Sequence, residues 1–542
     1  MGTAIRPGRG RPVTTRRRRH ERPTPMPPPE TDSTAFRRVE RVGTLALFGL
    51  YALVFSKYIQ LNSSDLGRHL KNGEIILSRY AVPTVNEYSY TAPDFPFLNH
   101  HWASGVLFHL VHRLAGFPGL SLFAVAVAVA TFGLFFAVAR REARFDVAAA
   151  AALIMLPVIG SRIEIRPEMF SYLWSGAFLA ILWRERRGDA SWRALALLPV
   201  IEVLWVNTHL YFFFGLILVG VFLVEAVAAR LGGEAGRGRS PLPLLLAGAA
   251  TAFATLVNPA GLRGALYPLS VLGNYGYDVA ENQPVLVLER LINFPPALYF
   301  KIAFAVLAAS WVYAAWDATR RRASSPALFL LSLFVSVIAW RAVRNFALFG
   351  YVALVAVAIN LHQLPEPAWL ARRRTLLVPA FLGALAVMLV VLHVPYWRGQ
   401  ANFTGLGVRP GNLAALEFYR AEGLRGPIFN NFDIGSYLIW GLYPQERVFV
   451  DNRPEAYPAA FFKEELLPIL RDETRWREAD DRYHFNVIFF SHRDNALGPE
   501  FLARRLHDPA WATVFVDDDI IIVLRRDEQN RDVIRRHELE VE

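Results

Sequence analysis

Residues 43–79 read GTLALFGLYALVFSKYIQLNSSDLGRHLKNGEIILSR, and this stretch passes from a membrane-like segment to a polar one. Its first part, 43–60, is apolar and follows a long basic tail, which is typical of an uncleaved signal anchor. The polar part reaches Asp65 immediately after the apolar run, and a helix is expected over 69–79. The stretch therefore predicts a membrane span followed by a surface loop that begins with a carboxylate.

The rest of the chain has the same apolar character. Of its 542 residues 54% are hydrophobic and 19% are charged, whereas soluble domains have about 25% charged residues. This excludes a purely soluble enzyme, a disordered chain and a fibrous chain. Cysteine is absent, so disulfides, thiolate nucleophiles and cysteine-ligated metals are excluded as well. A divalent metal would have to use His, Asp or Glu, and the sequence neither requires nor identifies one.

Further apolar runs follow the first. They lie near 117–139, 146–160, 168–183, 193–208, 210–229, 242–258, 297–317, 326–342, 345–361 and 375–394. A membrane span needs about 20 apolar residues, so we predict about eleven spans. The 193–229 region could also be one long helix, and 102–115 is an amphipathic segment suited to the membrane interface.

The arginines support this topology, because cytoplasmic loops of membrane proteins are enriched in cationic residues. If the N-terminus is inside and the spans alternate, every inside loop is basic. These loops carry Arg140, Arg141 and Arg144; Arg184, Arg186 and Arg187; Arg230, Arg237 and Arg239; Arg320, Arg321 and Arg322; and Arg372, Arg373 and Arg374. An odd number of spans then places the C-terminal region outside.

The basic inside loops explain the net charge of +11. We therefore expect the protein to contact the lipid bilayer and not to bind nucleic acid. Lysine occurs at four positions and all other cationic residues are arginine, which indicates a GC-rich, bacterial genome. We therefore expect a multi-pass protein of the bacterial inner membrane.

The chain divides into three parts by composition. Residues 1–38 form a basic tail expected to be disordered and cytoplasmic. Residues 39–394 form the multi-span domain, with long outer loops at 61–101 and 259–296. Residues 395–542 alternate charged helical stretches with β-rich runs, which predicts a periplasmic α/β domain. Its expected strands are 447–450, 485–490, 511–516 and 520–524.

Polar residues just outside the spans are the candidates for chemistry, because charges at that depth are costly and usually face a cavity. In the first outer loop these are Asp65, Arg68, His69, His100 and His101. Asp65 could act as a general base or bind a cation; the alternative is a helix N-cap. The histidines could bind phosphate or a metal, and we expect at most one of the adjacent pair to be functional.

The second outer loop contains Arg162, Glu164 and Arg166, which alternation places on one side of an extended segment. Pro167 is expected at the first position of the next helix. Two arginines outside the membrane oppose the charge rule, and binding of an anionic phosphate would explain them. The alternative is an Arg–Glu ion-pair network.

Four further polar residues lie near the outer face. Asn207 and His209 interrupt an apolar stretch and could donate into a cavity or join two helices. Arg341 and Arg344 could contact a phosphate or reach lipid headgroups. In the C-terminal domain, polar residues around Asn430 and Asn452 follow β-rich runs, where α/β domains place ligand sites, although turn chemistry explains them equally well.

The layout of the first loop resembles the GT-C class of membrane glycosyltransferases. The shared features are an acidic residue past the first span, a juxtamembrane helix at 66–79, a break at Val82 and Pro83, and a polar end before an amphipathic helix. The span number and the outer C-terminal domain agree with that class. The adjacent acidic pair of many members is absent, since Asp65 lies between Ser64 and Leu66, so metal dependence stays open.

The resemblance implies a polyprenyl-phosphate-linked sugar as donor and an acceptor that the sequence does not identify. It implies that Asp65 is the base or metal ligand. The matching residues of the second loop are Arg162, Glu164, Arg166 and Glu168, of which Glu168 is a second catalytic candidate. Two other functions stay open: a transporter or flippase of a lipid-linked substrate, and a non-catalytic membrane assembly protein.

Overall fold

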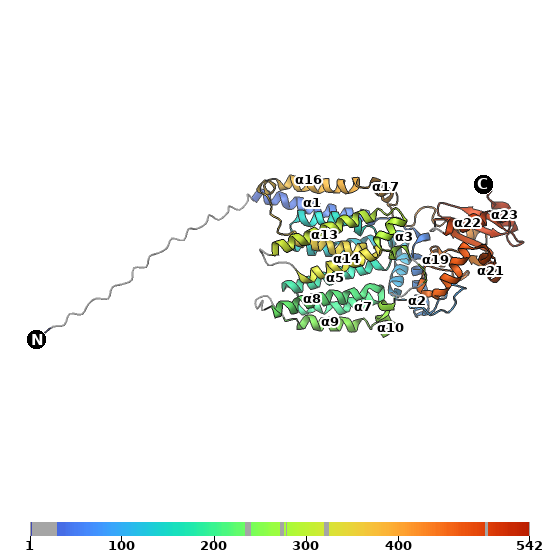
Figure 1. Cartoon of the computed structure of the whole chain (residues 1–542), viewed down its shortest axis with the longest axis horizontal. Helices are drawn as coiled ribbons and strands as arrows, with labels where there is room; N and C mark the ends of the chain where they lie inside the picture. The colour runs from blue at the N-terminus through green and yellow to red at the C-terminus, as the bar shows by residue number, and fades with distance from the viewer. Residues whose placement is uncertain are drawn as a thin grey trace.

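The computed structural model is an elongated bundle of helices with a compact domain at one end (Figure 1). It describes residues 2, 30–232, 240–270, 276–277, 279–318, 325–493 and 497–540. Helix α1 (Glu30–Phe55) begins at the end of the bundle that is farthest from the C-terminal domain. The helix thus includes the last part of the predicted 1–38 tail. Most of that tail, Arg237, Arg239 and Arg320 to Arg322 lie outside the described residues.

Each predicted apolar run coincides with a helix of the bundle. Besides α1 these are α3 (Trp102–Glu142), α4 (Phe145–Ile159), α5 (Glu168–Arg187), α7 (Leu197–Thr208), α8 (Phe213–Leu231), α9 (Leu242–Ala254), α13 (Pro296–Ala318), α14 (Pro326–Arg341), α15 (Phe346–Asn360) and α16 (Ala368–Val391). Within the described residues, five helical segments are long and apolar enough to cross a membrane, namely α3, η2 with α8, α13, η4 with α15, and α16. Helices α4, α9 and α14 are apolar but shorter.

Two uncertain stretches are settled by the backbone. The 193–229 region is not one long helix, because the short helix α6 (Trp192–Leu195) precedes α7, α7 ends at Thr208, and a 3-10 turn, η2 (Leu210–Phe212), precedes α8. Helix α3 is interrupted at Gly116, whose φ of 62° is accessible to glycine. The predicted amphipathic segment 102–115 is therefore a separate helical piece in front of the apolar part.

Helix α2 (Leu66–Arg79) lies between the bundle and the C-terminal domain (Figure 1). On one side it crosses α3 so closely that a Cβ on Gly73 would lie 2.2 Å from the Gly105 carbonyl oxygen. On the other side it meets α19 (Gly435–Leu442), where a Cβ on Gly67 would lie 2.4 Å from the Ser436 carbonyl oxygen. The α2 backbone is thus closely packed against α19 at its N-terminal end and against α3 at its middle.

The C-terminal domain contains one four-stranded sheet with the order β1-β2-β4-β3. Its strands are β1 (Ile428–Phe429), β2 (Val487–Ser491), β3 (Trp511–Val516) and β4 (Ile520–Arg525). Strand β1 pairs in parallel with β2, and the other pairs are antiparallel. Its helices are α18 (Ala414–Ala421), α19, α20 (Leu467–Arg471), α21 (Glu473–Tyr483), α22 (Gly498–Leu506) and α23 (Arg531–His537).

Three of the four predicted strands are present, and the prediction at 447–450 is wrong. In that stretch Val448 forms an isolated bridge with Ser89 of the first outer loop instead of joining the sheet. Its apolar side chains are buried because the loop covers them. One continuous apolar core includes Leu66 of α2, Phe108 of α3 and Val487 of β2. The first outer loop, the amphipathic segment and the C-terminal domain therefore form a single packed unit.

Candidate functional site

Asp65 lies at the point where the bundle and the C-terminal domain meet. Its Oδ1 accepts a 2.5 Å hydrogen bond from Asn452 Nδ2. Its Oδ2 lies 3.6 Å from Arg68 Nη2 and 3.8 Å from Arg166 Nη1. Because the Asp65 side chain is 22% exposed, the carboxylate is partly accessible while its orientation is fixed by three partners.

The N-cap explanation of Asp65 is not supported by its contacts. Asp65 occupies the N-cap position of α2, but its side chain makes no capping hydrogen bond. The amide of Arg68, three residues on, donates instead to Ser436 Oγ at 2.9 Å. A side chain from the C-terminal domain thus satisfies this helix end, and the Asp65 carboxylate faces the arginines.

Arg162 and Arg166 converge on Glu281, a residue of the 259–296 loop. The distances from Glu281 Oε2 are 2.7 Å to Arg162 Nη1 and 2.9 Å to Arg166 Nη1. Arg344 Nη2 approaches Glu281 Oε1 at 3.5 Å. The prediction that Arg162 and Arg166 lie on one side of their segment is confirmed, since both reach the same carboxylate. We call Arg162, Arg166 and Arg344 the arginine cluster, and Glu281 is their shared partner.

Two more carboxylates complete the charge balance of the arginine cluster. Glu168 Oε1 lies 2.8 Å from Arg162, and Glu164 Oε2 lies 2.6 Å from Arg166. Glu168 is buried and opens α5, while Pro167 holds the N-cap position rather than the predicted first helical one. The Arg–Glu ion-pair network, the alternative to phosphate binding, is therefore present in this structure.

The field of the arginines is strong enough to determine the charge of Glu281. Burial alone would raise its pKa, but the nearby charges of Arg166, Arg162 and Arg344 outweigh burial and lower that pKa well below its ordinary value. Glu281 is thus an anion throughout the neutral and mildly acidic range. Removing it would leave three guanidinium groups without a shared counter-charge.

Four histidines pack together beside the arginine cluster. The ring of His101 lies 3.8 Å from that of His100, 5.5 Å from that of His69 and 5.2 Å from that of His209, measured between centroids. Both adjacent histidines join this group, contrary to the expectation for a helix, because they precede α3 and lie in a turn. The first outer loop and the turn between α7 and α8 meet at these rings.

The histidines are neutral imidazoles at pH 7. Burial lowers the pKa of His100 to about 3, although a hydrogen bond to the Leu98 carbonyl opposes this shift. Burial also lowers the pKa of His69, His101 and His209 well below the ordinary value, with further contributions from nearby arginines and histidines. The proposed imidazolium form for phosphate binding is therefore disfavoured, and positive charge in the site comes from arginine.

His209 is oriented by a hydrogen-bonded chain. Trp205 Nε1 donates to Ser171 Oγ at 2.7 Å, and Ser171 Oγ lies 2.7 Å from His209 Nδ1. The Tyr211 amide also donates to Nδ1, at 3.3 Å. Since Nδ1 accepts, the neutral ring carries its proton on Nε2. The Tyr211 amide thus fixes the tautomer of His209, and Ser171 with Trp205 orients the ring.

Asn207 and Arg341 do not join the site. The Asn207 amide accepts from Trp102 Nε1 and donates to the Val203 and Val257 carbonyls, each at 2.7 Å. Its groups are used in joining helices, which was the structural alternative. Arg341 ends α14 with an exposed side chain, and no ion pair ties it to the arginine cluster in the described part of the chain.

Asn452 is carried by a buried turn of the C-terminal domain. On its two sides Asp451 and Arg453 form a 2.7 Å ion pair with 0% and 1% exposure. Arg453 Nη2 also donates to Asn86 Oδ1 at 2.8 Å, and its guanidinium lies over the ring of Tyr88. The turn is thus locked to the first outer loop, and Asn452 is held against Asp65.

The described residues around Asp65 do not form a ready set of metal ligands. Within the described ranges, no three His, Asp or Glu side chains converge with a spacing that could hold a metal ion. The neighbours of Asp65 are two guanidinium groups and an amide. These groups suit an anionic ligand better than a cation.

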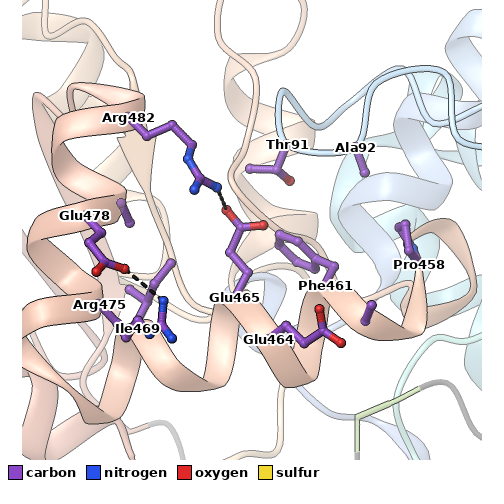
Figure 2. A pocket seen from close by; sticks show the side chains of 12 residues that line it. Thr91, Ala92, Pro458, Phe461, Glu464, Glu465, Ile469, Arg475, Glu478 and Arg482 are labelled. Carbon is purple, nitrogen blue, oxygen red and sulfur yellow. Dashed lines mark hydrogen bonds and ion pairs between the residues drawn. The ribbon is translucent and has the colours of Figure 1, made fainter.

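A separate cavity of about 390 Å³ lies in the C-terminal domain (Figure 2). It is lined by Thr91 and Ala92 of the first outer loop and by residues of the π-helical turn η6 (Phe461–Leu466), α20 and α21. Two ion pairs, Arg475–Glu478 within α21 and Arg482–Glu465 between α21 and η6, lie among its lining residues. It shares no residue with the predicted site, so we do not assign it to the same chemistry.

One residue of the site, Glu281, is not singled out by the sequence, and Asn452 is indicated there only as one of two alternatives. Glu281 stands in a loop whose sequence gives no periodic or charge signal for it. Asn452 lies in a polar stretch, but its neighbours Asp451 and Pro454 favour a turn. A useful signal exists for Asn452, since a short β-rich run directly precedes it.

The chain is similar to known proteins in its fold and not in its sequence. No protein-family model matches the chain, and no curated protein matches it. Among solved structures it is similar to ArnT from Cupriavidus metallidurans bound to undecaprenyl phosphate, with a TM-score of 0.50 and 14% identity over 90% of this chain and 98% of that chain. The chain thus shares the fold of this ArnT. The apo state of the same ArnT gives a TM-score of 0.49 and 16% identity over 91% and 98%.

The fold comparison confirms the resemblance expected from the first loop. ArnT is a GT-C glycosyltransferase, and the match extends over the bundle and the C-terminal domain. The chain is thus a multi-pass, GT-C-like protein with a small C-terminal sheet domain. At 14% identity the comparison establishes the fold, and it does not assign roles to individual residues.

Proposed function

We propose that the protein is a membrane glycosyltransferase that moves a sugar from a polyprenyl-phosphate donor to an acceptor hydroxyl. The observation that carries this proposal is the carboxylate of Asp65 lying 3.8 Å from Arg166, which itself belongs to the arginine cluster. A base and a phosphate-binding cation must stand close together for transfer from a lipid phosphate. The undecaprenyl phosphate bound to ArnT, a protein of the same fold, supports the same donor class.

The arginine cluster suits the leaving group. As the bond from the anomeric carbon to the phosphate oxygen breaks, negative charge grows on the phosphate and fixed cations stabilise it. Arginine binds phosphate through two parallel N–H donors and stays charged when buried. Arg162, Arg166 and Arg344 supply such donors at the end of the bundle.

Asp65 suits the acceptor side of the reaction. Its Oδ2 would take the proton of the acceptor hydroxyl while the acceptor oxygen forms its bond to the anomeric carbon. The products are the glycosylated acceptor and the polyprenyl phosphate, and the proton stays on the carboxylate until solvent removes it. A single displacement of this kind inverts the anomeric configuration.

The position of the site matches a substrate that cannot leave the bilayer. Asp65 and the arginine cluster stand at the bundle end, where the spans meet the first outer loop. The last turns of α3 and α5, at the other end of these helices, carry Arg140, Arg141, Arg184, Arg186 and Arg187. By the positive-inside rule we propose that this basic end is cytoplasmic and that the C-terminal domain is periplasmic. A periplasm-dependent reporter fused after residue 400 should be active.

The function is tested with purified protein in liposomes that contain a labelled polyprenyl-phosphate sugar. Cell-envelope lipids and glycans are offered as acceptors, and released polyprenyl phosphate is measured. Transfer by the wild type, lost in the Asp65→Asn variant, supports the proposal. Movement of intact donor across the bilayer without cleavage would support a transporter instead. Absence of both donor binding and transfer would favour an assembly protein.

A further inference from the structure

Glu281 is the common partner of three arginines that come from two different loops. Arg162 and Arg166 contact its Oε2 at 2.7 and 2.9 Å, and Arg344 approaches its Oε1 at 3.5 Å. A carboxylate surrounded by several guanidinium groups presents the same acceptor chemistry as a phosphate oxygen pair. The Glu281 carboxylate thus contacts the same guanidinium N–H groups that would donate hydrogen bonds to a bound phosphate.

The other carboxylates around these arginines are held differently. Glu168 is buried in the first turn of α5 and contacts Arg162, and Glu164 lies two residues before its partner Arg166. Both belong to the same short segment as the arginines and are fixed by it. Glu281 belongs to a different segment and reaches Arg162 and Arg166 from 119 and 115 residues away along the chain.

The element that carries Glu281 is lightly attached. It is the 3-10 turn η3 (Ala280–Asn282), which contains no buried residue. Besides the ion pairs of Glu281, its contacts to the rest of the fold include Asn282 Oδ1 with Arg344 Nη1 at 2.9 Å and the neighbouring Gln283 carbonyl with the Val343 amide at 3.3 Å. The described contacts of η3 itself are thus polar or ionic, and an incoming anion can replace the ionic ones. Tyr277, three residues before η3, stacks on Phe432 and would keep the segment near the site when Glu281 leaves.

We propose that Glu281 occupies the position of the donor phosphate before the donor binds, and that donor binding displaces Glu281 from the arginine cluster. This inference rests on the proposed function, because it assumes that the anion is the phosphate of a polyprenyl phosphate. The exchange keeps the cluster's positive charge neutralised in both states. It also makes Glu281 a competitor that weak anions, such as inorganic phosphate, do not overcome without a lipid tail held in the bilayer.

The test uses the full-length protein in detergent micelles with polyprenyl phosphate as the probe. The matched control is Glu289→Gln, which removes the same charge in the same outer segment but from an ion pair with Lys301 at 2.7 Å. We expect Glu281→Gln to bind polyprenyl phosphate about tenfold more tightly than the wild type does, because the competing carboxylate is gone. Glu289→Gln should bind as the wild type does.

A second readout separates competition from simple structural support. Without ligand, Glu281→Gln should unfold at a lower temperature than the wild type, because three arginines lose a counter-charge. Polyprenyl phosphate should then raise its unfolding temperature more than that of the wild type. Dephosphorylated polyprenol should show no such difference, and inorganic phosphate should gain affinity in Glu281→Gln alone.

The outcomes distinguish the two proposals. If the wild type binds polyprenyl phosphate and Glu281→Gln binds it equally or more weakly, the displacement of Glu281 is wrong while the donor assignment stands. If neither the wild type nor the variants bind polyprenyl phosphate, the donor assignment is wrong and the inference fails with it. Tighter binding of polyprenol as well would show that the tail site changed, which also contradicts the exchange.

Discussion

Asn452 of the C-terminal domain donates a 2.5 Å hydrogen bond to Asp65 Oδ1 and accepts one from Arg68 Nε at 3.3 Å. One side chain of the C-terminal domain therefore fixes both the carboxylate and its neighbouring cation. The turn that carries Asn452 is itself buried against the first outer loop. The C-terminal domain is thus part of the candidate site and not an appended module.

The first prediction concerns Asn452 as a positioning residue. Asn452→Ala removes the bond that orients Asp65, and hydrogen bonds to charged groups contribute about 1.5–3 kcal/mol. We expect kcat to fall roughly ten- to hundredfold, with KM for the donor little changed, because the arginine cluster stays intact. Steady-state kinetics in liposomes measure this split. A raised KM with unchanged kcat would show that Asn452 acts on substrate binding instead.

The second prediction concerns the buried pair beside it. Replacing Arg453 by Met leaves the Asp451 carboxylate buried without its cation, which typically costs about 3–5 kcal/mol. The unfolding midpoint in denaturant should therefore fall sharply. The control is Arg475→Met, which breaks an exposed pair with Glu478 at 60% and 54% exposure and should cost at most about 1 kcal/mol. Equal effects of the two variants would contradict a structural role for the Asp451–Arg453 pair.

The third prediction follows from the neutral histidines. Their pKa values are lowered by burial in the folded protein, and an exposed histidine in the unfolded chain titrates near 6.5. The unfolded state therefore binds protons first, and folding stability falls as pH drops below about 6.5, by roughly 1.4 kcal/mol per pH unit for each histidine. His69→Phe, at a position 1% exposed, should flatten this decline.

Unfolding temperatures at pH 7.5, 6 and 5 measure the effect. The loss of stability from carboxylates such as Glu281 begins lower, below the ordinary carboxyl pKa of about 4.3. The two contributions are therefore separated in pH. A variant that declines in parallel with the wild type above pH 5 would show that His69 does not titrate on unfolding.

The sequence was sufficient for the helices because their signal is local. The apolar runs coincide with helices, and the juxtamembrane helix predicted at 66–79 is α2. The strand prediction at 447–450 failed because alternation of apolar residues records burial and not pairing. Val448 is buried, but its partner is Ser89 of the outer loop, and no local pattern contains that information.

The sequence could predict which side chains of the site lie together only where these residues belong to the same short segment. Arg162, Glu164 and Arg166 could be placed on one side by alternation, and the charge rule singled out the arginines. Glu281 and Asn452 come from distant segments, and their side chains reach the site through tertiary packing. The choice between phosphate binding and an ion-pair network was open for the same reason, because the counter-charge that occupies the arginines lies in another loop.

The fourth prediction concerns Arg162 and Arg166 as phosphate ligands. Replacing either by Ala should weaken binding of polyprenyl phosphate, because a charge-assisted donor is lost. Arg166→Ala should also lower kcat, since Arg166 lies 3.8 Å from Asp65. Lipid binding measured at increasing salt gives the test. Unchanged affinity with a lowered unfolding temperature would show that the arginines serve the ion-pair network alone.

The last prediction concerns Asp65, the proposed base. Asp65→Asn keeps the size of the side chain and removes its charge and basicity. Since a general base contributes about 10²–10⁴-fold, transfer should fall by that order while donor binding persists. Asp65 makes no capping hydrogen bond, so Asp65→Ala should lose transfer to a similar extent without the stability cost of a lost cap. The decisive measurement is the transfer rate of the Asn variant. A normal rate would remove Asp65 from the mechanism, because the amide cannot accept the proton of the acceptor hydroxyl.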